Sequence, residues 1–355
     1  MKTHKLPTKI HAFCHKHPVV FALWAALATL VSVLGLFLLI VFASSFIYTA
    51  LHKDEPRQWG ASFSVKHAED IGLDWRQAFT DITNELPLKK LRLMSYWDLI
   101  EPTPGAYLFE DLDWQMDEAH KKGMKISLAI GLRQPRWPEC HEPDWAKPQI
   151  TDKNYDALYA YMQAVVERYR NHPALESYQL ENEAMLRVFG ECVDFNRDRL
   201  HYEMDMVRKL DPNHPIYMSL NGQTELPSQG PHPDAYGYSL YRRNWVKEAG
   251  FYVDYPYLPS WYSGRGQLIK WYTGKPVFIH ELQLEPWGPR QAWEILPYEQ
   301  DYTMSVSRLR TTMKFARETQ IKDIYLWGSE WWYWRKTVMQ DPTIWKAVEE
   351  ELLKG

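Results

Sequence analysis

Short apolar runs alternate with longer amphipathic stretches over most of the chain. Eight short runs are rich in aliphatic, β-branched or aromatic residues, as expected for buried strands. They cover residues 59–65, 89–96, 124–131, 175–181, 215–222, 235–241, 275–281 and 323–329. Between them, apolar positions recur every three or four residues, which predicts helices. The helical stretches are 109–123, 154–171, 196–212 and 302–320.

Eight strands alternating with helices over this length predict a (β/α)8 TIM barrel. A doubly wound parallel sheet is the structural alternative. No glycine-rich phosphate loop follows the first strand, however, since residues 60–72 read GASFSVKHAEDIG. The barrel is therefore the preferred fold class. It predicts functional side chains at the C-terminal ends of the strands.

The N-terminal region differs in composition from the rest of the chain. Residues 18–51 contain no Asp, Glu, Lys or Arg, and about 20 apolar residues suffice to cross a bilayer. The run exceeds the roughly 7–15 apolar residues of a cleavable signal peptide. Lysines precede it, and the positive-inside rule therefore keeps residues 1–17 in the cytoplasm.

These features predict a single-pass membrane protein with an extracytoplasmic barrel. Residues 1–17 are expected to be a basic cytoplasmic tail and 18–51 a transmembrane signal anchor. Residues 52–60 read as a short polar linker, and residues 58–355 as the catalytic domain.

Composition narrows the function further. The net charge of −4 gives no support for nucleic-acid binding. The 13 histidines show no metal-ligand spacing, so we expect no catalytic metal and no cofactor. The chain is rich in aromatics, with 17 Trp and 22 Tyr. These either fill a large core or line a groove for sugar rings.

Two glutamates follow predicted strands at the catalytic face. Glu183 lies just past the fourth strand, and Glu281 ends the seventh. A carboxylate buried there must be paired or must do chemistry. Two carboxylates at one barrel mouth suit glycoside hydrolysis, in which roughly 5 Å between them implies retention of configuration. The alternatives are loop hydrogen bonds for Glu183 and an ion pair with Arg92 for Glu281. Two further carboxylates at this face, Glu285 and Glu330, are expected to be subsite contacts or salt-bridge partners.

The motifs LENEA (180–184) and FIHE (278–281) resemble those of the clan A glycoside hydrolases, such as the family 5 cellulases and mannanases. The resemblance implies that Glu183 is the acid/base and Glu281 the nucleophile. It also implies that Asn182 contacts the sugar 2-hydroxyl.

Further motifs extend the resemblance over about residues 58–335. RLMSYW is similar to the clan's second-strand motif and implies that Arg92 lies near the nucleophile. The segment 100–126 resembles one found in galactosidase-like and xylanase-like members. Tyr241 matches the tyrosine that hydrogen-bonds the nucleophile, and Trp327 matches the tryptophan that forms the floor of the central sugar subsite.

Several tryptophans are candidates for the wall of a sugar-binding groove. Trp97 and Trp137 fall in predicted loops at the catalytic face. Part of the aromatic run EWWYW (330–334) is also expected to be exposed, because consecutive side chains point in different directions.

The sequence therefore predicts a retaining glycoside hydrolase acting on an extracytoplasmic, β-linked oligo- or polysaccharide. A transglycosylase of envelope glycan and a catalytically inactive sugar-binding barrel are the alternatives. A structural envelope protein is a third reading, which the aromatics at the site face disfavour.

A disulfide between Cys140 and Cys192 is also predicted. The two cysteines follow the third and fourth strands, whose loops lie side by side in a barrel. An extracytoplasmic location permits oxidation. Two unpaired thiols are the alternative.

Overall fold

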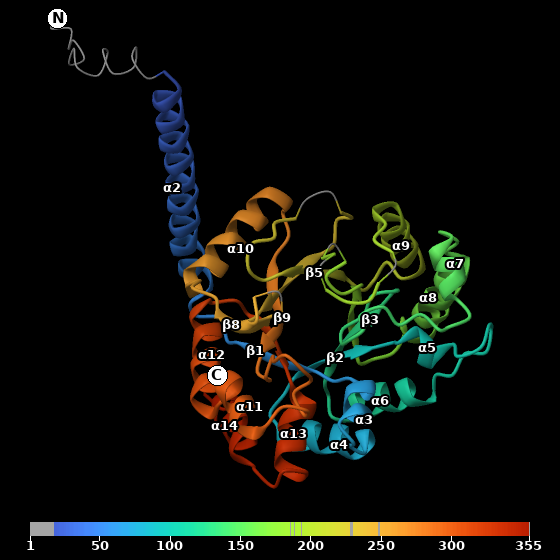
Figure 1. Ribbon diagram of the computed structural model, residues 1–355. Coiled ribbons are helices and arrows are strands. Elements are labelled where there is room, and N and C mark those ends of the chain that lie inside the picture. The colour runs from blue at the N-terminus through green and yellow to red at the C-terminus, as the bar shows by residue number, and fades with distance from the viewer. Residues whose placement is uncertain are drawn as a thin grey trace, which may run out of the picture.

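The computed structural model describes residues 18–354, apart from residues 185, 188, 193, 228, 229 and 248. The predicted cytoplasmic tail, residues 1–17, lies outside the described residues. Eight parallel strands form a closed barrel in the order β1-β2-β3-β4-β5-β6-β9-β10, and β10 pairs with β1 (Figure 1). The predicted (β/α)8 barrel is confirmed.

Each predicted strand overlaps one strand of the barrel. The barrel strands are β1 (Gln58–Ser62), β2 (Lys90–Met94), β3 (Lys125–Ile130), β4 (Leu175–Leu180), β5 (Ile216–Asn221), β6 (Ala235–Leu240), β9 (Val277–Gln283) and β10 (Asp323–Trp327). Nearly every residue of these strands is buried. The barrel helices cover their outer faces, which explains why the strands are apolar runs without alternation.

The helices of the barrel domain include the four that the sequence predicts, namely α6, α8, α9 and α12. Among the described residues, the helices of this domain are α3 (Val65–Asp70), α4 (Trp75–Glu85), α5 (Trp97–Ile100), α6 (Glu110–Lys121), α7 (Lys147–Thr151), α8 (Asp156–Tyr169), α9 (Arg197–Leu210), α10 (Pro259–Thr273), α11 (Pro297–Met304), α12 (Val306–Glu318), α13 (Ser329–Thr337) and α14 (Thr343–Leu352).

The barrel departs from a regular alternation around β6. In the described part of the chain, no helix joins β5 to β6. After β6 the chain instead forms an antiparallel hairpin of β7 (Arg243–Val246) and β8 (Phe251–Asp254), followed by α10.

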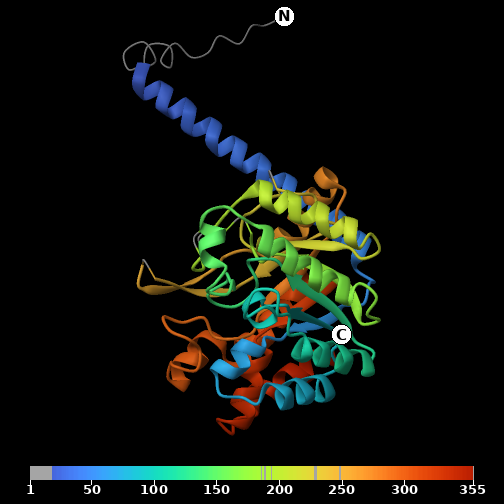
Figure 2. The same ribbon diagram turned by 90° about the vertical axis from the view of Figure 1, so that its right-hand side faces the viewer.

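A long apolar helix, α2 (Pro18–His52), precedes the barrel and is long enough to cross a membrane. It projects away from the domain, but its last turns lie along α10 (Figures 1 and 2). The predicted linker is shorter than expected, because only residues 53–57 separate α2 from β1. Arg57 donates to Gln320 Oε1 over 2.8 Å and to the carbonyl oxygen of His52 over 3.1 Å, which ties this connection to the barrel.

The aromatic run 330–334 lies in α13, and all five of its residues are buried. The prediction that part of it is exposed is wrong. The helix packs against α4 and α14, and Trp331 donates to Gln300 of α11 over 3.1 Å. Consecutive side chains do point in different directions, but each of them packs against other parts of the protein.

Candidate active site

The segment Glu181–Asn182–Glu183 forms a sharp turn at the end of β4. Glu181 and Glu183 have φ angles of 48° and 42°, a left-handed conformation that is uncommon for residues other than glycine. The turn separates the two carboxylates. Glu181 pairs with Arg199 of α9, outside the barrel wall, whereas Glu183 lies toward β6 at the mouth.

Two serines position Glu183. Its backbone N–H donates to Ser219 Oγ of β5 over 2.6 Å, and its carboxylate accepts a hydrogen bond from Ser239 of β6. Ser239 is in register with Glu281 of β9, so the two glutamates share one side of the mouth. Burial raises the pKa of Glu183 to about 7, and the negative charge of Glu281 contributes to the rise. Glu183 is therefore largely protonated below neutral pH.

Glu281 has the opposite electrostatic environment. Burial disfavours its ionisation, but Arg92 Nη2 lies 2.8 Å from Oε1, and Tyr241 donates its hydroxyl to Oε2 over 3.0 Å. His280 Nε2 lies 3.5 Å from Oε1. These partners together hold the pKa of Glu281 below its ordinary value. The predicted ion pair with Arg92 is therefore present beside a protonatable Glu183.

Asn182 is held from both sides of its amide. Its Oδ1 accepts from Gln179 Nε2 over 3.2 Å, and its Nδ2 donates to Glu139 Oε2 over 3.0 Å. Glu139 was not predicted as a site residue. Burial raises its pKa to about 8, although Arg133, with Nε 3.6 Å from Oε2, and Asn182 oppose the rise. No spacing in the sequence marks Glu139, whose place depends on the fold of the loop after β3.

The loops after β3 and β4 form one wall of the site. Cys140 and Cys192 are joined by a disulfide, with their Cα atoms 5.3 Å apart, which confirms the predicted pairing. Arg133 also donates to the carbonyl oxygen of Phe189 over 2.8 Å. The backbone N–H of Glu191 donates to the carbonyl oxygen of Pro138 over 2.9 Å. The wall is therefore fixed covalently and by hydrogen bonds next to Glu183.

Trp327 ends β10 at the mouth, close to Arg92. The guanidinium carbon of Arg136 lies 4.0 Å from the centre of the Trp327 ring, and that of Arg92 lies 5.3 Å away. Arg136 is itself paired with Glu285 at 2.5 Å and with Glu330 at 3.1 Å. Glu285 and Glu330, the two further carboxylates at this face, are thus salt-bridge partners of one arginine. Arg136 was not foreseen as a site residue.

Comparisons with known proteins support the same fold. No family model matches the chain. Over 164 residues, 41% of the chain and 35% of its relative, it is 26% identical to mannan endo-1,4-β-mannosidase F from Aspergillus fumigatus. It is also 32% identical over 116 residues to a β-galactosidase from Arthrobacter, covering 27% of this chain and 17% of that one. The chain spans less than half the length of the curated relatives it matches.

Among solved structures, an exo-β-1,4-mannosidase from an Opitutaceae bacterium superposes with a TM-score of 0.54 at 17% identity, over 76% of this chain and 51% of that chain. Xylanase 10B from Thermotoga maritima gives 0.52 at 14% identity, over 85% and 95% of the respective chains. The chain has the fold of the clan A glycoside hydrolases. Its curated relatives are glycoside hydrolases as well.

The predicted tryptophan wall of the barrel is only partly present at the surface. Trp97 is completely buried, stacks on Tyr161 and donates to Glu101 over 2.8 Å. It offers no surface to a substrate, so its predicted role as a sugar contact does not fit the structure. Trp137 is half-exposed and packs edge-on against Phe189, at the rim of the site.

The rim continues from Phe189 toward Glu281. Phe189 contacts Trp287, and Trp287 packs edge-on against Tyr241, the hydrogen-bond partner of Glu281. Trp137, Phe189, Trp287 and Tyr241 therefore form an aromatic rim that leads from the surface to Glu281.

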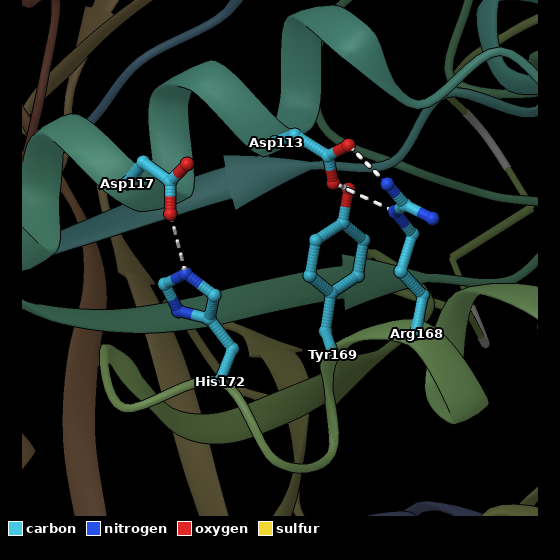
Figure 3. A pocket seen from close by; sticks show the side chains of 5 residues that line it. All are labelled: Asp113, Asp117, Arg168, Tyr169 and His172. Atoms are coloured by element: carbon cyan, nitrogen blue, oxygen red, sulfur yellow. Dashed lines mark hydrogen bonds and ion pairs between the residues drawn. The ribbon is translucent and has the colours of Figure 1, made fainter.

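A separate hollow lies on the outer wall of the barrel, between α6 and α8 (Figure 3). Its charged side chains are paired with one another. Arg168 Nε donates to Asp113 over 2.7 Å, and His172 lies 3.2 Å from Asp117. The hollow is a surface ion-pair cluster away from the strand ends, and we assign it no role in the site.

Proposed function

We propose that the chain is a retaining glycoside hydrolase in which Glu281 is the nucleophile and Glu183 the acid/base. One observation carries this proposal. Glu183 and Glu281, which lie on one side of the mouth, have pKa values that are shifted in opposite directions, with that of Glu183 raised to about 7 and that of Glu281 lowered. A double displacement requires one protonated and one ionised carboxyl group at the start of the reaction.

In the first step, Glu281 attacks the anomeric carbon while Glu183 donates its proton to the departing glycosidic oxygen. The C–O bond to the leaving group breaks, and a covalent glycosyl-enzyme forms. In the second step, Glu183 accepts a proton from water, which attacks the anomeric carbon and releases Glu281. Arg92 and Tyr241 hold Glu281 ionised and oriented. We expect the two carboxyl groups to lie roughly 5–5.5 Å apart.

The remaining contacts in the proposed site follow from their positions. Asn182 contacts the 2-hydroxyl of the reacting sugar, and Trp327 forms the floor beneath it. Trp137 provides a partly exposed aromatic face for a neighbouring sugar. The substrate is a β-linked oligo- or polysaccharide.

We also propose that α2 anchors the enzyme in a membrane, with residues 1–17 in the cytoplasm and the barrel outside. The length and apolar composition of α2 support an anchor. The Cys140–Cys192 disulfide supports the extracytoplasmic side, where disulfides persist.

The roles of the two glutamates can be tested by chemical rescue with azide. In Glu281→Gly, azide should attack from the face that the nucleophile has vacated and yield an α-glycosyl azide. In Glu183→Ala, an activated aryl β-glycoside should still form the glycosyl-enzyme, and azide should yield a β-glycosyl azide. The products are identified by NMR. Rescue with the opposite stereochemistry would exchange the two roles.

The same substrates separate the alternatives. An inactive sugar-binding barrel would bind aryl glycosides without releasing phenol in the wild-type enzyme. A transglycosylase would release phenol and transfer the glycosyl group to added oligosaccharide in preference to water.

A further inference from the structure

The last turns of α2 belong to the barrel domain. Val41, Ser44, Ser45 and Tyr48 are buried, and their spacing places them on one face of the helix. This face lies against α10. A side chain at Gly264 of α10 would overlap the carbonyl oxygen of Val41, so the two helix backbones touch there.

The opposite face of the same turns is apolar and uncovered. Phe46 is 78% exposed and Ile47 is 44% exposed. The exposed residues of α2 before this docked region are also almost entirely apolar. The cost of leaving this apolar face in water grows with its exposed length, so a position of the barrel close to the bilayer is favoured.

With Pro18 placed at the cytoplasmic edge of the hydrocarbon, the length of α2 gives the position of the outer hydrocarbon boundary. Residues 18–37 of α2 span about 30 Å at 1.5 Å per residue, which equals the hydrocarbon thickness of a bilayer. Phe37 packs edge-on against Trp261, in the first turn of α10. The first turn of α10 therefore lies at the boundary of the hydrocarbon region.

Exposed apolar side chains flank this first turn of α10. Leu258, its N-cap residue, is 57% exposed. Leu226 is 43% exposed and follows Gln223, whose carbonyl oxygen accepts from Trp261 Nε1 over 2.8 Å. We propose that Leu226, Leu258 and the exposed residues Leu39 and Ile40 of α2 form a bilayer-contact surface, so that the barrel rests directly on the lipid headgroups.

The orientation of α2 indicates where the substrate of the barrel is located. Figure 2 shows α2 leaning toward the side of the barrel from which the β7–β8 hairpin projects. This hairpin follows the C-terminal end of β6, at the catalytic face. Resting on the proposed function, we infer that the substrate is a glycan carried at the membrane surface, because the mouth is held at a fixed short height above the lipid.

Fluorescence quenching tests the bilayer-contact surface. Cys14, the one cysteine of the sequence outside the disulfide, is replaced by Cys14→Ser so that only the introduced thiol reacts. The full chain with this change and Leu258→Cys is labelled with bimane in phosphatidylcholine nanodiscs that contain headgroup spin-labelled lipid. Leu353→Cys is the matched control, because it is exposed but lies after α14, away from the projecting end of α2 (Figure 1). We expect strong quenching at position 258 and little at 353. Equal quenching at the two positions would overturn the proposal.

Two variants and one control test whether the quenching depends on the α2–α10 contact and on the proposed surface. Gly264→Leu should undock α10 and reduce quenching at position 258, whereas Gly35→Leu should not, because no atom lies near Gly35. Leu226→Glu places a charge in the proposed surface without altering the core and should also reduce quenching. If Leu226→Glu leaves quenching at position 258 unchanged, the surface is assigned wrongly.

Kinetics test the substrate class separately. The rate on a dodecyl β-glycoside in nanodiscs is divided by the rate on a soluble aryl β-glycoside of the same sugar. We expect Leu226→Glu to lower this ratio about threefold or more, since weaker membrane contact lifts the mouth from the lipid, while the aryl rate is unchanged. An unchanged ratio would refute the membrane-borne substrate. Absence of aryl hydrolysis in the wild-type enzyme would refute the proposed function, whereas the quenching would still decide the surface.

Discussion

Two clusters of buried charge lie on opposite sides of the turn at residues 181–183. The outer cluster consists of Glu181, Asp194, Arg199 and Glu203, and the inner cluster consists of Glu183, Glu281, Arg92 and Tyr241. In the outer cluster, Arg199 pairs with all three carboxylates. In the inner cluster, Arg92 pairs with Glu281, and Glu183 accepts a hydrogen bond from Ser239 instead of a cation.

The presence or absence of a cationic partner distinguishes carboxylates that stabilise the fold from carboxylates that can exchange a proton. Glu181 is buried with a bidentate cation and has no room to exchange protons with a substrate. Glu183 is partly exposed at the mouth, and its pKa of about 7 allows it to gain and lose a proton near neutral pH. Burial and acidity alone therefore do not identify a catalytic carboxylate. The absence of a cationic partner beside an accessible carboxylate is more informative.

The largest expected effect comes from the carboxylates themselves. We expect Glu281→Gln and Glu183→Gln each to lower kcat on a natural glycan about 10²–10⁴-fold, with little change in the unfolding temperature. Glu181→Gln should show the reverse pattern, with a lower unfolding temperature and a kcat within about tenfold of wild type. Kinetics and thermal unfolding of all three variants check this, and full activity in either inner variant would contradict the assignment.

The next effect concerns the stability of the outer cluster. Arg199→Met would leave three carboxylates without their shared cation, so we expect a loss of about 3–5 kcal/mol in the free energy of unfolding. Arg168→Met is the matched control, because Arg168 pairs with Asp113 at the surface. It should cost about 0–1 kcal/mol. Denaturant unfolding measures both, and equal losses would show that the outer cluster contributes no more than a surface pair.

The smallest effect is on the pH profile of kcat/KM. The rate should fall as pH rises through about 7, because Glu183 loses the proton that it must donate. It should also fall in acid, below the ordinary carboxyl range, as Glu281 becomes protonated. Tyr241→Phe removes one hydrogen bond that favours ionised Glu281 and should move only the acidic limb to higher pH. Movement of the alkaline limb alone would contradict the assignment of the two limbs.

Much of the fold could be predicted because the barrel strands are continuous apolar runs. Helix α10 was missed, and its composition explains why. It packs between α2 and the barrel, with Gly264 where the backbone of α2 approaches, so it lacks a polar face with helical spacing. The β7–β8 hairpin was also missed, since its strands are four residues long and half-exposed.

The site was predictable where residues lie at or near the C-terminal ends of strands. Arg92 and Glu281 lie in the C-terminal halves of β2 and β9, Glu183 and Tyr241 follow β4 and β6, and the structure brings them together. Glu139 and Arg136 come from the interior of a long loop, with φ angles of 76° and 85°. Their approach to Asn182 and Trp327 depends on tertiary contacts that no local pattern encodes. The burial of Trp97 has the same origin.

The closure of the barrel by β1 and β10 has a consequence for biosynthesis. Gln58 pairs with Asp323, so the first barrel strand finds its second neighbour only after almost the whole chain has been made. During translation, β1 follows α2 with one edge unpaired, and such an edge favours pairing with other chains. Premature termination before β10 would leave this edge permanently open. We therefore expect truncated products to depend on chaperones and proteases for their removal.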